Sequence, residues 1–395
     1  MKIGIYGGTF DPIHRGHITA AQAAAQQLGL DLLLLIPASI PPHKALPEGG
    51  ADAAQRLEMA TLATAELSCP AQVLDVEERR QGKSYTADTL RTLRQQYPED
   101  ELWLLMGTDM FLSLQDWREP QEILRLVRVA AFSRTGDPEQ QRFARQKAYL
   151  EETFGAQVTV VENPHVVDIS STRLRQLLPE GREYLPEAVY GYILRQRLYG
   201  THAELKHLTP EELRPIALSF LKPKRMPHVL GTEQEAIRLA RRYGADETDA
   251  RIAALLHDCT KKLDMEQQLA LCRRYDIRLD ELEQHALKLL HAKTGAAVAR
   301  DIFGVKDAVY EAIRWHTTGK PDMTLLEKVI YLADYIEPNR DFPGVDELRR
   351  AVYDDLDKGL LMGLSDTIDE MERMGNPVHH DTLEARDFLL RGEAK

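Results

Sequence analysis

Short apolar runs alternate with amphipathic stretches over the first half of the chain. The apolar runs predict strands over residues 2–6, 31–36, 71–76, 101–106, 127–133 and 157–161, and helical patterns lie between them, as over 16–28, 53–67 and 86–97. Strands that alternate with helices predict a mostly parallel, doubly wound α/β sheet. Ligands of such sheets bind beyond the carboxyl ends of the strands, so the residues that follow each strand are the first candidates for function.

The strand signal ends at about residue 203. A helix start follows, in which Thr209 caps, Pro210 takes the first position and Glu212 completes a capping box. Helical patterns then extend over 209–221, 232–243, 246–258, 264–274, 279–289, 293–303, 306–316, 324–336 and 345–375. The sequence therefore predicts two domains, a Rossmann-like α/β domain over 1–200 and an all-α domain over 201–395.

Composition narrows the class of protein. The 395 residues are 43% hydrophobic and 28% charged, and no apolar run reaches the ~18 residues of a membrane span. A net charge of −12 without a Lys/Arg block disfavours nucleic-acid binding but not nucleotide binding, which needs few donors. Three dispersed cysteines, and a chain that opens on a strand pattern without a signal peptide, favour a cytoplasmic protein with reduced thiols. The oligomeric state stays open.

A glycine-rich string follows the first expected strand. It is Gly7-Gly8-Thr9-Phe10-Asp11-Pro12-Ile13-His14-Arg15-Gly16-His17, and it runs into a helix. Two glycines let the backbone approach a ligand closely, and the helix N-terminus offers N–H groups and a positive dipole end to phosphate. His14 and His17, three residues apart at the helix entry, are therefore candidate phosphate donors.

Two elements of this chain resemble the nucleotidyltransferase superfamily. Its HxGH element is His14-Arg15-Gly16-His17, and its ISSTxxR element is Ile169-Ser170-Ser171-Thr172-Arg173-Leu174-Arg175, just after the last expected strand. Hydroxyls, a new helix N-terminus and an arginine suit the β- and γ-phosphates of ATP. Either element alone would favour a plain turn or helix cap, but the two together at opposite ends of one domain favour a nucleotide site.

Further segments resemble nicotinate-nucleotide adenylyltransferase throughout residues 1–200. They are Pro41-Pro42-His43-Lys44, Ser84-Tyr85-Thr86-Ala87-Asp88-Thr89-Leu90, Gly107-Thr108-Asp109-Met110 and Asp116-Trp117. The resemblance implies that Tyr85, Thr86 and Trp117 hold the pyridine ring, and stacking on an indole suits a flat heteroaromatic ring. These segments argue against the rival acceptor, another phosphate-bearing molecule such as phosphopantetheine.

The resemblance implies adenylyl transfer from ATP to nicotinate mononucleotide, whose phosphate is already an anion and needs no general base. The residues expected at the transferred phosphate are His14, His17 and Lys44. Those expected at the leaving pyrophosphate are Ser171, Thr172 and Arg175. Further substrate contacts are expected from Gly7, Gly8, Thr9, Phe10, Gly107, Asp109 and Arg134. Mg²⁺ would arrive with the ATP.

Histidines and carboxylates recur along the helical half, at His228, His257-Asp258, His291, His316 and Asp334. Asp258 follows the apolar run 252–256, and a carboxylate buried there needs a partner or a metal. Asp334 borders the apolar side of the helix over 324–336. A single histidine is more often a core or surface residue, but imidazoles mixed with carboxylates suit Fe, Mn or Zn.

This arrangement resembles the HD-domain metal-dependent phosphohydrolases. Residues 225–350 resemble, more narrowly, the YqeK-type symmetrical diadenosine-tetraphosphate hydrolases. The matching segments are Leu255-Leu256-His257-Asp258 with Lys261 and Lys262, His291-Ala292-Lys293-Thr294-Gly295-Ala296, His316-Thr317-Thr318-Gly319, Tyr331-Leu332-Ala333-Asp334-Tyr335-Ile336-Glu337-Pro338 and Arg340-Asp341-Phe342-Pro343-Gly344.

The resemblance implies cleavage of diadenosine tetraphosphate into two ADP at a site with one or two divalent metals, iron being expected and manganese or zinc the alternatives. The implied ligands of the first metal are His228, His257, Asp258 and Asp334. Those of the second are His291 and His316, with Asp258 as the bridge. Lys261 and Arg340 are expected to bind phosphate. Two alternatives stay open: hydrolysis of another nucleotide, such as a dNTP or a guanosine polyphosphate, and a ligand-binding regulatory module without turnover.

Overall fold

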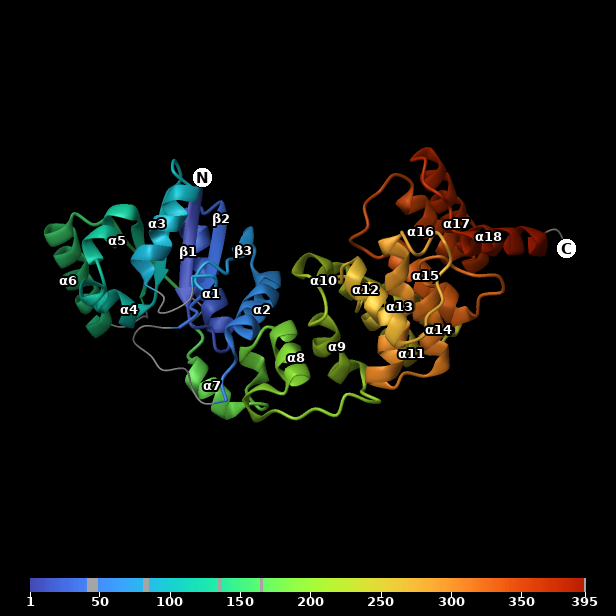
Figure 1. Ribbon diagram of the computed structural model, residues 1–395, viewed down its shortest axis with the longest axis horizontal. Coiled ribbons are helices and arrows are strands. Elements are labelled where there is room, and N and C mark those ends of the chain that lie inside the picture. Colours follow the sequence, from blue (N-terminus) through green and yellow to red (C-terminus); the bar gives the residue numbers. More distant parts are fainter. Residues whose placement is uncertain (41–48, 81–84, 134–136, 164–165, 394–395) are drawn as a thin grey trace. The chain divides into compact units, whose positions relative to one another are not determined.

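The computed structural model describes residues 1–40, 49–80, 85–133, 137–163 and 166–393. Contacts within the chain divide it into two compact units, Met1–His202 and Ala203–Lys395. All strands of the described residues lie in the first unit, and the second unit is built of helices and their connecting turns (Figure 1).

Six parallel strands form one sheet in the first unit. They are β1 (Lys2–Gly8), β2 (Leu32–Pro37), β3 (Ala71–Val73), β4 (Glu101–Met106), β5 (Arg128–Ser133) and β6 (Val158–Glu162). Their order is β3-β2-β1-β4-β5-β6, and Figure 1 shows β1, β2 and β3 side by side. Because the chain runs outward from β1 to β3 and resumes on the other side of β1 with β4, the ends of β1 and β4 form the switch point where such sheets bind ligands.

Eight helices connect the strands or follow them among the described residues of the first unit. They are α1 (Arg15–Leu28), α2 (Ala53–Ala63), α3 (Thr86–Gln96), α4 (Thr108–Leu112), α5 (Pro120–Leu126), α6 (Asp137–Phe154), α7 (Ser171–Leu177) and α8 (Glu187–Gln196), with 3₁₀ turns at Thr64–Glu66, Leu114–Asp116, Arg182–Tyr184 and Leu198–Gly200. Leu33, Leu34 and Leu35 of β2 are successive residues, yet each is at most 1% exposed. Such burial of both faces is typical of a parallel sheet covered on both sides, and the predicted α/β fold is confirmed.

The second unit is helical, as predicted. Its helices are α9 (Pro210–Leu218), α10 (Met226–Tyr243), α11 (Glu247–Leu256), α12 (Met265–Arg274), α13 (Leu287–Phe303), α14 (Asp307–Trp315), α15 (Leu325–Ile336), α16 (Val345–Asp354), α17 (Leu356–Arg373) and α18 (His380–Glu393), with a 3₁₀ turn at Pro223–Arg225. Thr209 caps α9, and its hydroxyl accepts the backbone N–H of Glu212, which completes the predicted capping box.

Two predicted helix patterns in this unit are wrong in detail, and one helix was not predicted. The stretch 279–286 is a series of turns, because Asp280 and Glu283 exchange backbone-to-carboxylate hydrogen bonds of 2.8 and 3.0 Å in place of a helix. The expected helix over 345–375 breaks at Asp355, whose extended backbone and side chain cap α17. Helix α18 was not predicted; its preceding residue is His379, whose ring accepts the N–H of Asp381 in place of a Ser, Thr or Asp cap.

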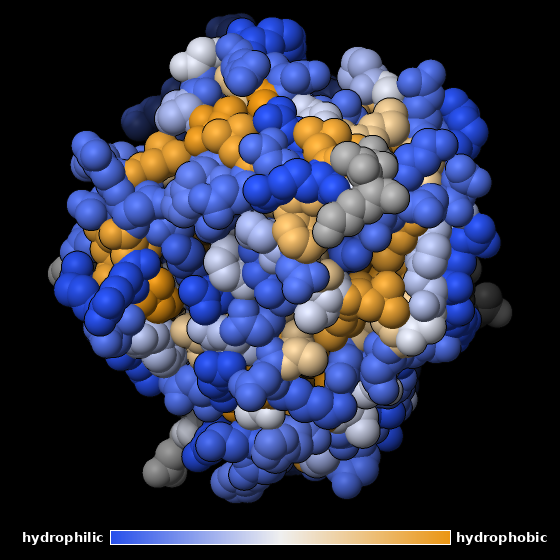
Figure 2. Space-filling view, turned by 90° about the vertical axis from the view of Figure 1, so that its right-hand side faces the viewer, coloured by the Kyte–Doolittle hydropathy of each residue, from blue (hydrophilic) through white to orange (hydrophobic). Residues whose placement is uncertain are grey.

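The surface of the molecule shows no extended apolar band in the view of Figure 2, where apolar side chains form separate patches among hydrophilic ones. Near the C-terminus the exposed apolar residues include Met374, Phe388 and Leu390, at 53%, 39% and 47% exposure. Scattered apolar residues of this kind are ordinary on a protein surface. None of the helices described for this chain is long and apolar enough to cross a bilayer.

Candidate active sites

The turn after β1 places two uncharged imidazoles at the start of α1. His14, the residue before α1, is 5% exposed, and the ring centres of His14 and His17 lie 3.8 Å apart. Burial lowers the pKa of His14 to about 4, and burial with the neighbouring His14 lowers the pKa of His17 well below its usual range. The N–H of His14 donates to His17 Nδ1 over 3.2 Å, so the ring proton of His17 lies on Nε2. His17 Nε2–H is therefore a neutral donor suited to a phosphate oxygen.

The second predicted element docks against the first. The hydroxyl of Ser171, the first residue of α7, donates to the carbonyl of Pro12 over 2.9 Å. Arg175 Nη1 donates to the carbonyl of Asp11 over 2.5 Å, and its Nη2 donates to Thr172 Oγ1 over 3.4 Å. The fold thus brings together two elements that lie at opposite ends of the unit's sequence.

Asp11 lies at the centre of this junction and was not predicted. It is 1% exposed, and its Oδ1 accepts the hydroxyl of Tyr199 over 2.6 Å and the N–H of Ala51 over 3.1 Å. Its Oδ2 lies 3.7 Å from Arg175 Nη1. The signal in the sequence was an acidic residue inside a glycine-rich string expected to bind phosphate. A carboxylate repels phosphate, so its presence there indicates that its charge is balanced by other groups of the protein.

Arg56 of α2 is a second residue that was not predicted. It is fully buried, and its guanidinium donates to three carbonyl oxygens, those of Thr9, Ala38 and Ser39. These bonds tie the turn after β1 to the chain just beyond β2. No sequence pattern marks this role, because it exists only once the two turns lie side by side.

A cavity of about 440 Å³ opens at the ends of β1 and β4. The predicted residues that line it are Gly7, Gly8, Thr9, Phe10, His17, Tyr85, Thr86, Gly107 and Trp117. Glu77 and Arg118 also line it and were not predicted, and the Arg118 guanidinium lies 4.4 Å from the centre of the Tyr85 ring. A mostly apolar cavity suits a flat ring, and the Arg118 guanidinium beside Tyr85 offers a positive charge, whereas Glu77 offers a negative one.

The remaining predicted residues of this unit lie elsewhere. His14, Ser171, Thr172 and Arg175 belong to the junction of α1 with α7, outside the lining of the cavity. Asp109 is exposed in the first turn of α4. Lys44 and Arg134 lie outside the described residues.

In the second unit, hydrogen bonds through Nδ1 orient the four predicted histidines. His257, His291 and His316 each place Nδ1 2.6–2.8 Å from the carbonyl oxygen three residues earlier, that of Ala254, Lys288 and Ile313. His228 Nδ1 lies 3.1 Å from Glu337 Oε1. Since Nδ1 carries the proton in these bonds, each Nε2 is left with a lone pair, which is how outer partners prepare histidines for metal binding.

The predicted ligands of the first metal converge. His228 Nε2 lies 2.9 Å from Asp334 Oδ1 and 3.4 Å from His257 Nε2, and His257 Nε2 lies 3.4 Å from Asp258 Oδ2. Ligand atoms bonded at about 2.0–2.2 Å to one ion are separated by about 3–3.6 Å. The spacing of these side chains therefore fits a divalent cation.

The other predicted ligands form a second group that shares Asp258. His291 Nε2 lies 3.2 Å from Asp258 Oδ1 and 3.1 Å from His316 Nε2, and His316 Nε2 lies 4.0 Å from Asp258 Oδ1. The two carboxylate oxygens of Asp258 face different groups, which is the geometry of a bridging ligand. Asp258 Oδ1 is buried and makes no hydrogen bond to any described residue, as expected of an oxygen reserved for a cation.

Three cationic side chains surround the two carboxylates. Arg225 Nε donates to Asp258 Oδ2, Lys261 Nζ lies 3.6 Å from Asp258 Oδ1, and Arg340 Nη2 donates to Asp334 Oδ1 over 2.8 Å. Burial of Asp258 would raise its pKa, but His257, His291 and Lys261 outweigh burial and hold the pKa well below its usual range. Lys261 Nζ also lies 2.9 Å from His291 Nε2, one of the predicted metal ligands.

A third cluster of Asp280, His379 and His380 also brings possible ligand atoms together. His379 Nδ1 accepts the N–H of Asp381 over 3.2 Å, so its ring proton lies on Nε2, which points toward carboxylates of Asp280 and Glu283 at 3.0 and 3.5 Å. The hydrogen bond to Glu283 raises the pKa of His379, although burial opposes it. This arrangement is that of a helix cap held by ion pairs.

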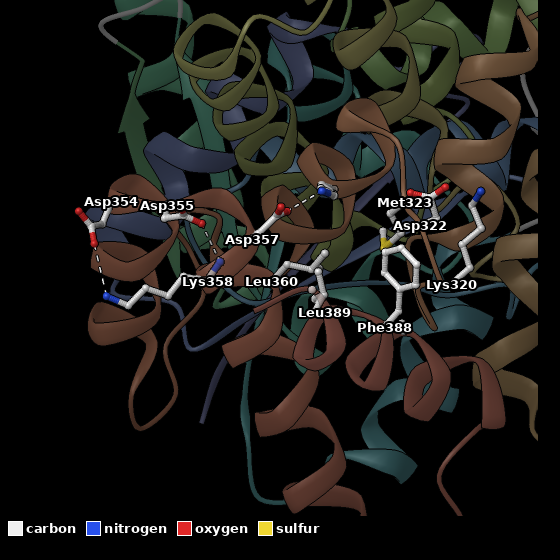
Figure 3. Close-up of a pocket in the computed structure, with 13 residues that line it drawn as sticks. Lys320, Asp322, Met323, Asp354, Asp355, Asp357, Lys358, Leu360, Phe388 and Leu389 are labelled. Carbon is white, nitrogen blue, oxygen red and sulfur yellow. Dashed lines mark hydrogen bonds and ion pairs between the residues drawn. The ribbon is translucent and has the colours of Figure 1, made fainter. Parts of the chain in front are cut away.

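A cavity of about 620 Å³ lies against α18 (Figure 3). Each of the three lysines described in its lining is paired: Lys320 with Glu327 at 3.2 Å, Lys328 with Asp357 at 2.5 Å and Lys358 with Asp354 at 3.4 Å. Since these cations are matched, the cavity offers little to a phosphate. It contains none of the predicted site residues.

Comparison with known proteins divides the chain in the same way. Residues 5–177 match the cytidylyltransferase-like family, and residues 225–339 match the HD domain family. A probable nicotinate-nucleotide adenylyltransferase of Gloeobacter violaceus is 43% identical over 209 residues, which are 51% of this chain and 98% of the relative. A symmetrical bis(5'-nucleosyl)-tetraphosphatase of Halalkalibacterium halodurans is 41% identical over 179 residues, which are 44% of this chain and 95% of the relative. The enzyme of the same name from Bacillus subtilis is 42% identical over 183 residues, which are 46% of this chain and 98% of the relative. The chain belongs to both enzyme families.

Two residues of the tetraphosphatase-family unit were not predicted. Arg225, three residues before His228, pairs with Asp258, and Glu337, three residues after Asp334, is 1% exposed and orients His228. Their spacing from the predicted ligands was the available signal. The HD domain implies divalent metal binding, and the groups His228–His257–Asp334 and His257–Asp258–His316 supply the donor atoms.

Replacing Glu337 by Gln should weaken metal binding by the tetraphosphatase-family unit about 10- to 100-fold, because the outer carboxylate that orients His228 is lost. Competition with a chromophoric chelator measures the affinity. Glu372→Gln, an exposed position of α17, is the matched control and should bind metal as the wild type does. Unchanged affinity in Glu337→Gln would show that Glu337 does not support a metal ligand.

Proposed function

We propose that this protein is bifunctional. Its α/β unit transfers the adenylyl group of ATP to nicotinate mononucleotide, giving deamido-NAD and pyrophosphate. Its helical unit hydrolyses diadenosine tetraphosphate symmetrically to two ADP. The names of the relatives that match each half at 41–43% identity support this proposal.

One observation carries the first activity: the two phosphate-binding elements meet beside a ring-sized cavity at the end of β1. His17 belongs to the HxGH element and also lines the cavity, which supports the proposal that it contacts the acceptor phosphate and the α-phosphate of ATP. The attacking phosphate oxygen is already anionic, and the unit therefore has to align it in line with the α-phosphorus.

The roles in the first unit follow from charge. His17 and His14 give neutral hydrogen bonds to the transferred phosphate, and Lys44 gives a positive charge there. Arg175, with the start of α7 at Ser171 and Thr172, stabilises the charge on the departing pyrophosphate. Mg²⁺ enters with ATP and neutralises the phosphate chain.

The second activity is carried by the convergence of four Nε2 atoms and two carboxylates in a buried group with one unbonded carboxylate oxygen. Bound divalent ions supply a water of lowered pKa and neutralise phosphate oxygens. His228, His257, Asp258 and Asp334 would hold one ion, and His291 and His316, with Asp258, would hold a second. Iron is the proposed metal, and manganese and zinc are the alternatives that metal analysis decides.

Lys261 and Arg340 supply the remaining charge in the second unit. Arg340 stands at the rim of the site on Asp334, one third exposed, where it reaches a phosphate chain. Lys261 Nζ lies 2.9 Å from His291 Nε2, so an ion held by His291 would compete with Lys261 for that nitrogen. The ammonium would then be available to donate to a phosphate oxygen.

The first unit should prefer nicotinate over nicotinamide mononucleotide, because the cavity wall carries the Arg118 charge close to Tyr85. The measurement is kcat/KM for the two acceptors with ATP and Mg²⁺. A ratio of at least tenfold in favour of the acid is expected from one charge-assisted contact worth about 1.5–3 kcal/mol. Equal values would refute the acid preference.

His17→Ala should lower adenylyl transfer by about 10²–10³-fold, since one donor aimed at the reacting phosphate is removed. Hydrolysis of diadenosine tetraphosphate by the same preparation should be unchanged. His17→Gln restores an N–H donor near the position of Nε2 and should recover part of the rate, and His202→Ala, at an exposed site, should match the wild type. A nearly wild-type rate of adenylyl transfer by His17→Ala would show that His17 has no role in the reaction.

Asp258→Ala should lose bound metal and hydrolysis together while adenylyl transfer continues at the wild-type rate. Metal content is measured on protein purified without added metal, and products are separated by chromatography. Two ADP are expected from the wild type, and Asp369→Ala, an exposed position on α17, is the control.

Several outcomes count against this account of the second unit. ATP plus AMP as products would mean a different cleavage point, and preference for a dNTP or guanosine polyphosphate would mean another substrate. A wild type that binds metal and nucleotide without turnover would be a regulatory module. Hydrolysis that survives metal removal, or Asp258→Ala, would mean that the cluster is not a catalytic metal site.

A further inference from the structure

The segment after α8 makes a left-handed turn that fixes the direction of one tyrosine. Arg197, Tyr199 and Gly200 have positive φ angles of 54°, 54° and 72°, a conformation that residues other than glycine rarely adopt. The hydroxyl of Thr201 closes the turn by donating to the carbonyls of Leu198 (2.8 Å) and Ile193 (3.3 Å). Such backbone persists only where the surrounding contacts hold it in place, and it is often found beside functional sites.

The tyrosine of this turn reaches the phosphate-binding loop. The hydroxyl of Tyr199 donates to Asp11 Oδ1 over 2.6 Å, a short hydrogen bond to a charged acceptor and therefore a strong one. Burial and the bonded Asp11 carboxylate raise the pKa of the Tyr199 phenol. The hydroxyl thus keeps its proton and remains the donor.

Asp11 connects Tyr199 to Arg175. Its carbonyl accepts Arg175 Nη1 over 2.5 Å, and its Oδ2 lies 3.7 Å from the same nitrogen. On the other side, the N–H of Ala51 donates to Oδ1 over 3.1 Å. Because Asp11 is 1% exposed, water does not compete for these contacts, and the direction of the carboxylate depends on Tyr199 and Ala51.

We propose that Tyr199 is a positioning residue for adenylyl transfer: its hydroxyl orients the buried Asp11 carboxylate, and Asp11 holds the Arg175 guanidinium in the direction of the leaving pyrophosphate. The inference rests on the proposed function of the first unit. Tyr199 acts through Asp11 and Arg175, and the last segment of the unit therefore completes the site formed by its first turn.

Loss of the Tyr199 hydroxyl has a defined consequence. In Tyr199→Phe, Asp11 Oδ1 keeps the bond from Ala51 alone, so the carboxylate is free to shift. The Arg175 guanidinium then loses a fixed ion-pair partner 3.7 Å away, while its bonds to the Asp11 carbonyl and to Thr172 remain. A displacement of about 1 Å at a positioned group costs on the order of 10²-fold in rate. We expect kcat for transfer to fall about 10- to 100-fold while KM for nicotinate mononucleotide stays within about twofold. In the reverse reaction, KM for pyrophosphate should rise.

A double-mutant cycle tests the inference on the full chain. Forward and reverse kinetics are measured for the wild type, Tyr199→Phe, Arg175→Lys and the double variant, with Tyr190→Phe of α8 as the matched control. If Tyr199 acts through Arg175, the double variant should be no slower than Arg175→Lys alone, because coupled residues give non-additive effects. Tyr190→Phe should behave as the wild type does.

Three results would overturn the inference. Tyr199→Phe with wild-type kcat and pyrophosphate KM would leave the hydroxyl without a role in positioning. If the losses of kcat in Tyr199→Phe and Arg175→Lys multiply in the double variant, the two residues act independently. If Tyr199→Phe has a lowered Tm and regains wild-type kcat at low temperature, the role of Tyr199 is structural only. If Tyr199→Phe does not fold, Asp11→Asn paired with Arg175→Lys completes the same cycle, and additivity there also overturns the inference. A wild type without adenylyl transfer would instead contradict the proposed function.

Discussion

A carboxylate inside a protein is stable only if its charge is matched, and each unit of this chain is organised around one such group. In the α/β unit the group is Asp11, whose matching partners are a tyrosine hydroxyl, a backbone N–H and Arg175. In the helical unit it is Asp258, which is fully buried and surrounded by histidines, Arg225 and Lys261. Each carboxylate keeps one buried oxygen without a hydrogen bond among the described residues. The two oxygens differ in what they face: Asp11 Oδ2 faces the Arg175 guanidinium, whereas Asp258 Oδ1 faces the His291 imidazole as well as Lys261.

This difference accounts for the two kinds of chemistry. Around Asp11 the histidines are buried and uncharged at neutral pH, so the loop offers oriented neutral donors. In the proposed reaction, charge neutralisation falls to arginine, lysine and the ions that accompany ATP. Around Asp258 the imidazole nitrogens are turned inward by backbone carbonyls and Glu337, so their lone pairs face one another. Lone pairs and carboxylates facing one another are unfavourable without a cation, so this group is suited to divalent metal binding.

Much of the fold followed from the pattern of apolar residues, because parallel strands are continuous apolar runs and several helices begin at a Ser, Thr or Asp cap. The predictions were wrong where side-chain hydrogen bonds changed the local structure. Asp280 and Glu283 form turns where a helix was expected, and α18 begins after His379, a residue type that is not a usual helix cap. Glycines, histidines and the hydroxyl-rich element marked the site residues in sequence. The contacts of Asp11, Arg56 and Arg225 could not be deduced in this way, because their partners lie far along the chain and meet them only in the folded unit.

The central claim is that the charge of Asp258 is balanced by bound metal when the enzyme works. Anomalous X-ray diffraction from crystals of the full chain, collected above and below the absorption edges of iron, manganese and zinc, tests it most directly. The account predicts an anomalous peak within bonding distance of His228 Nε2, His257 Nε2 and the carboxylates of Asp258 and Asp334. Active protein whose crystals show no anomalous peak there, with Arg225 and Lys261 still paired with Asp258, would contradict it.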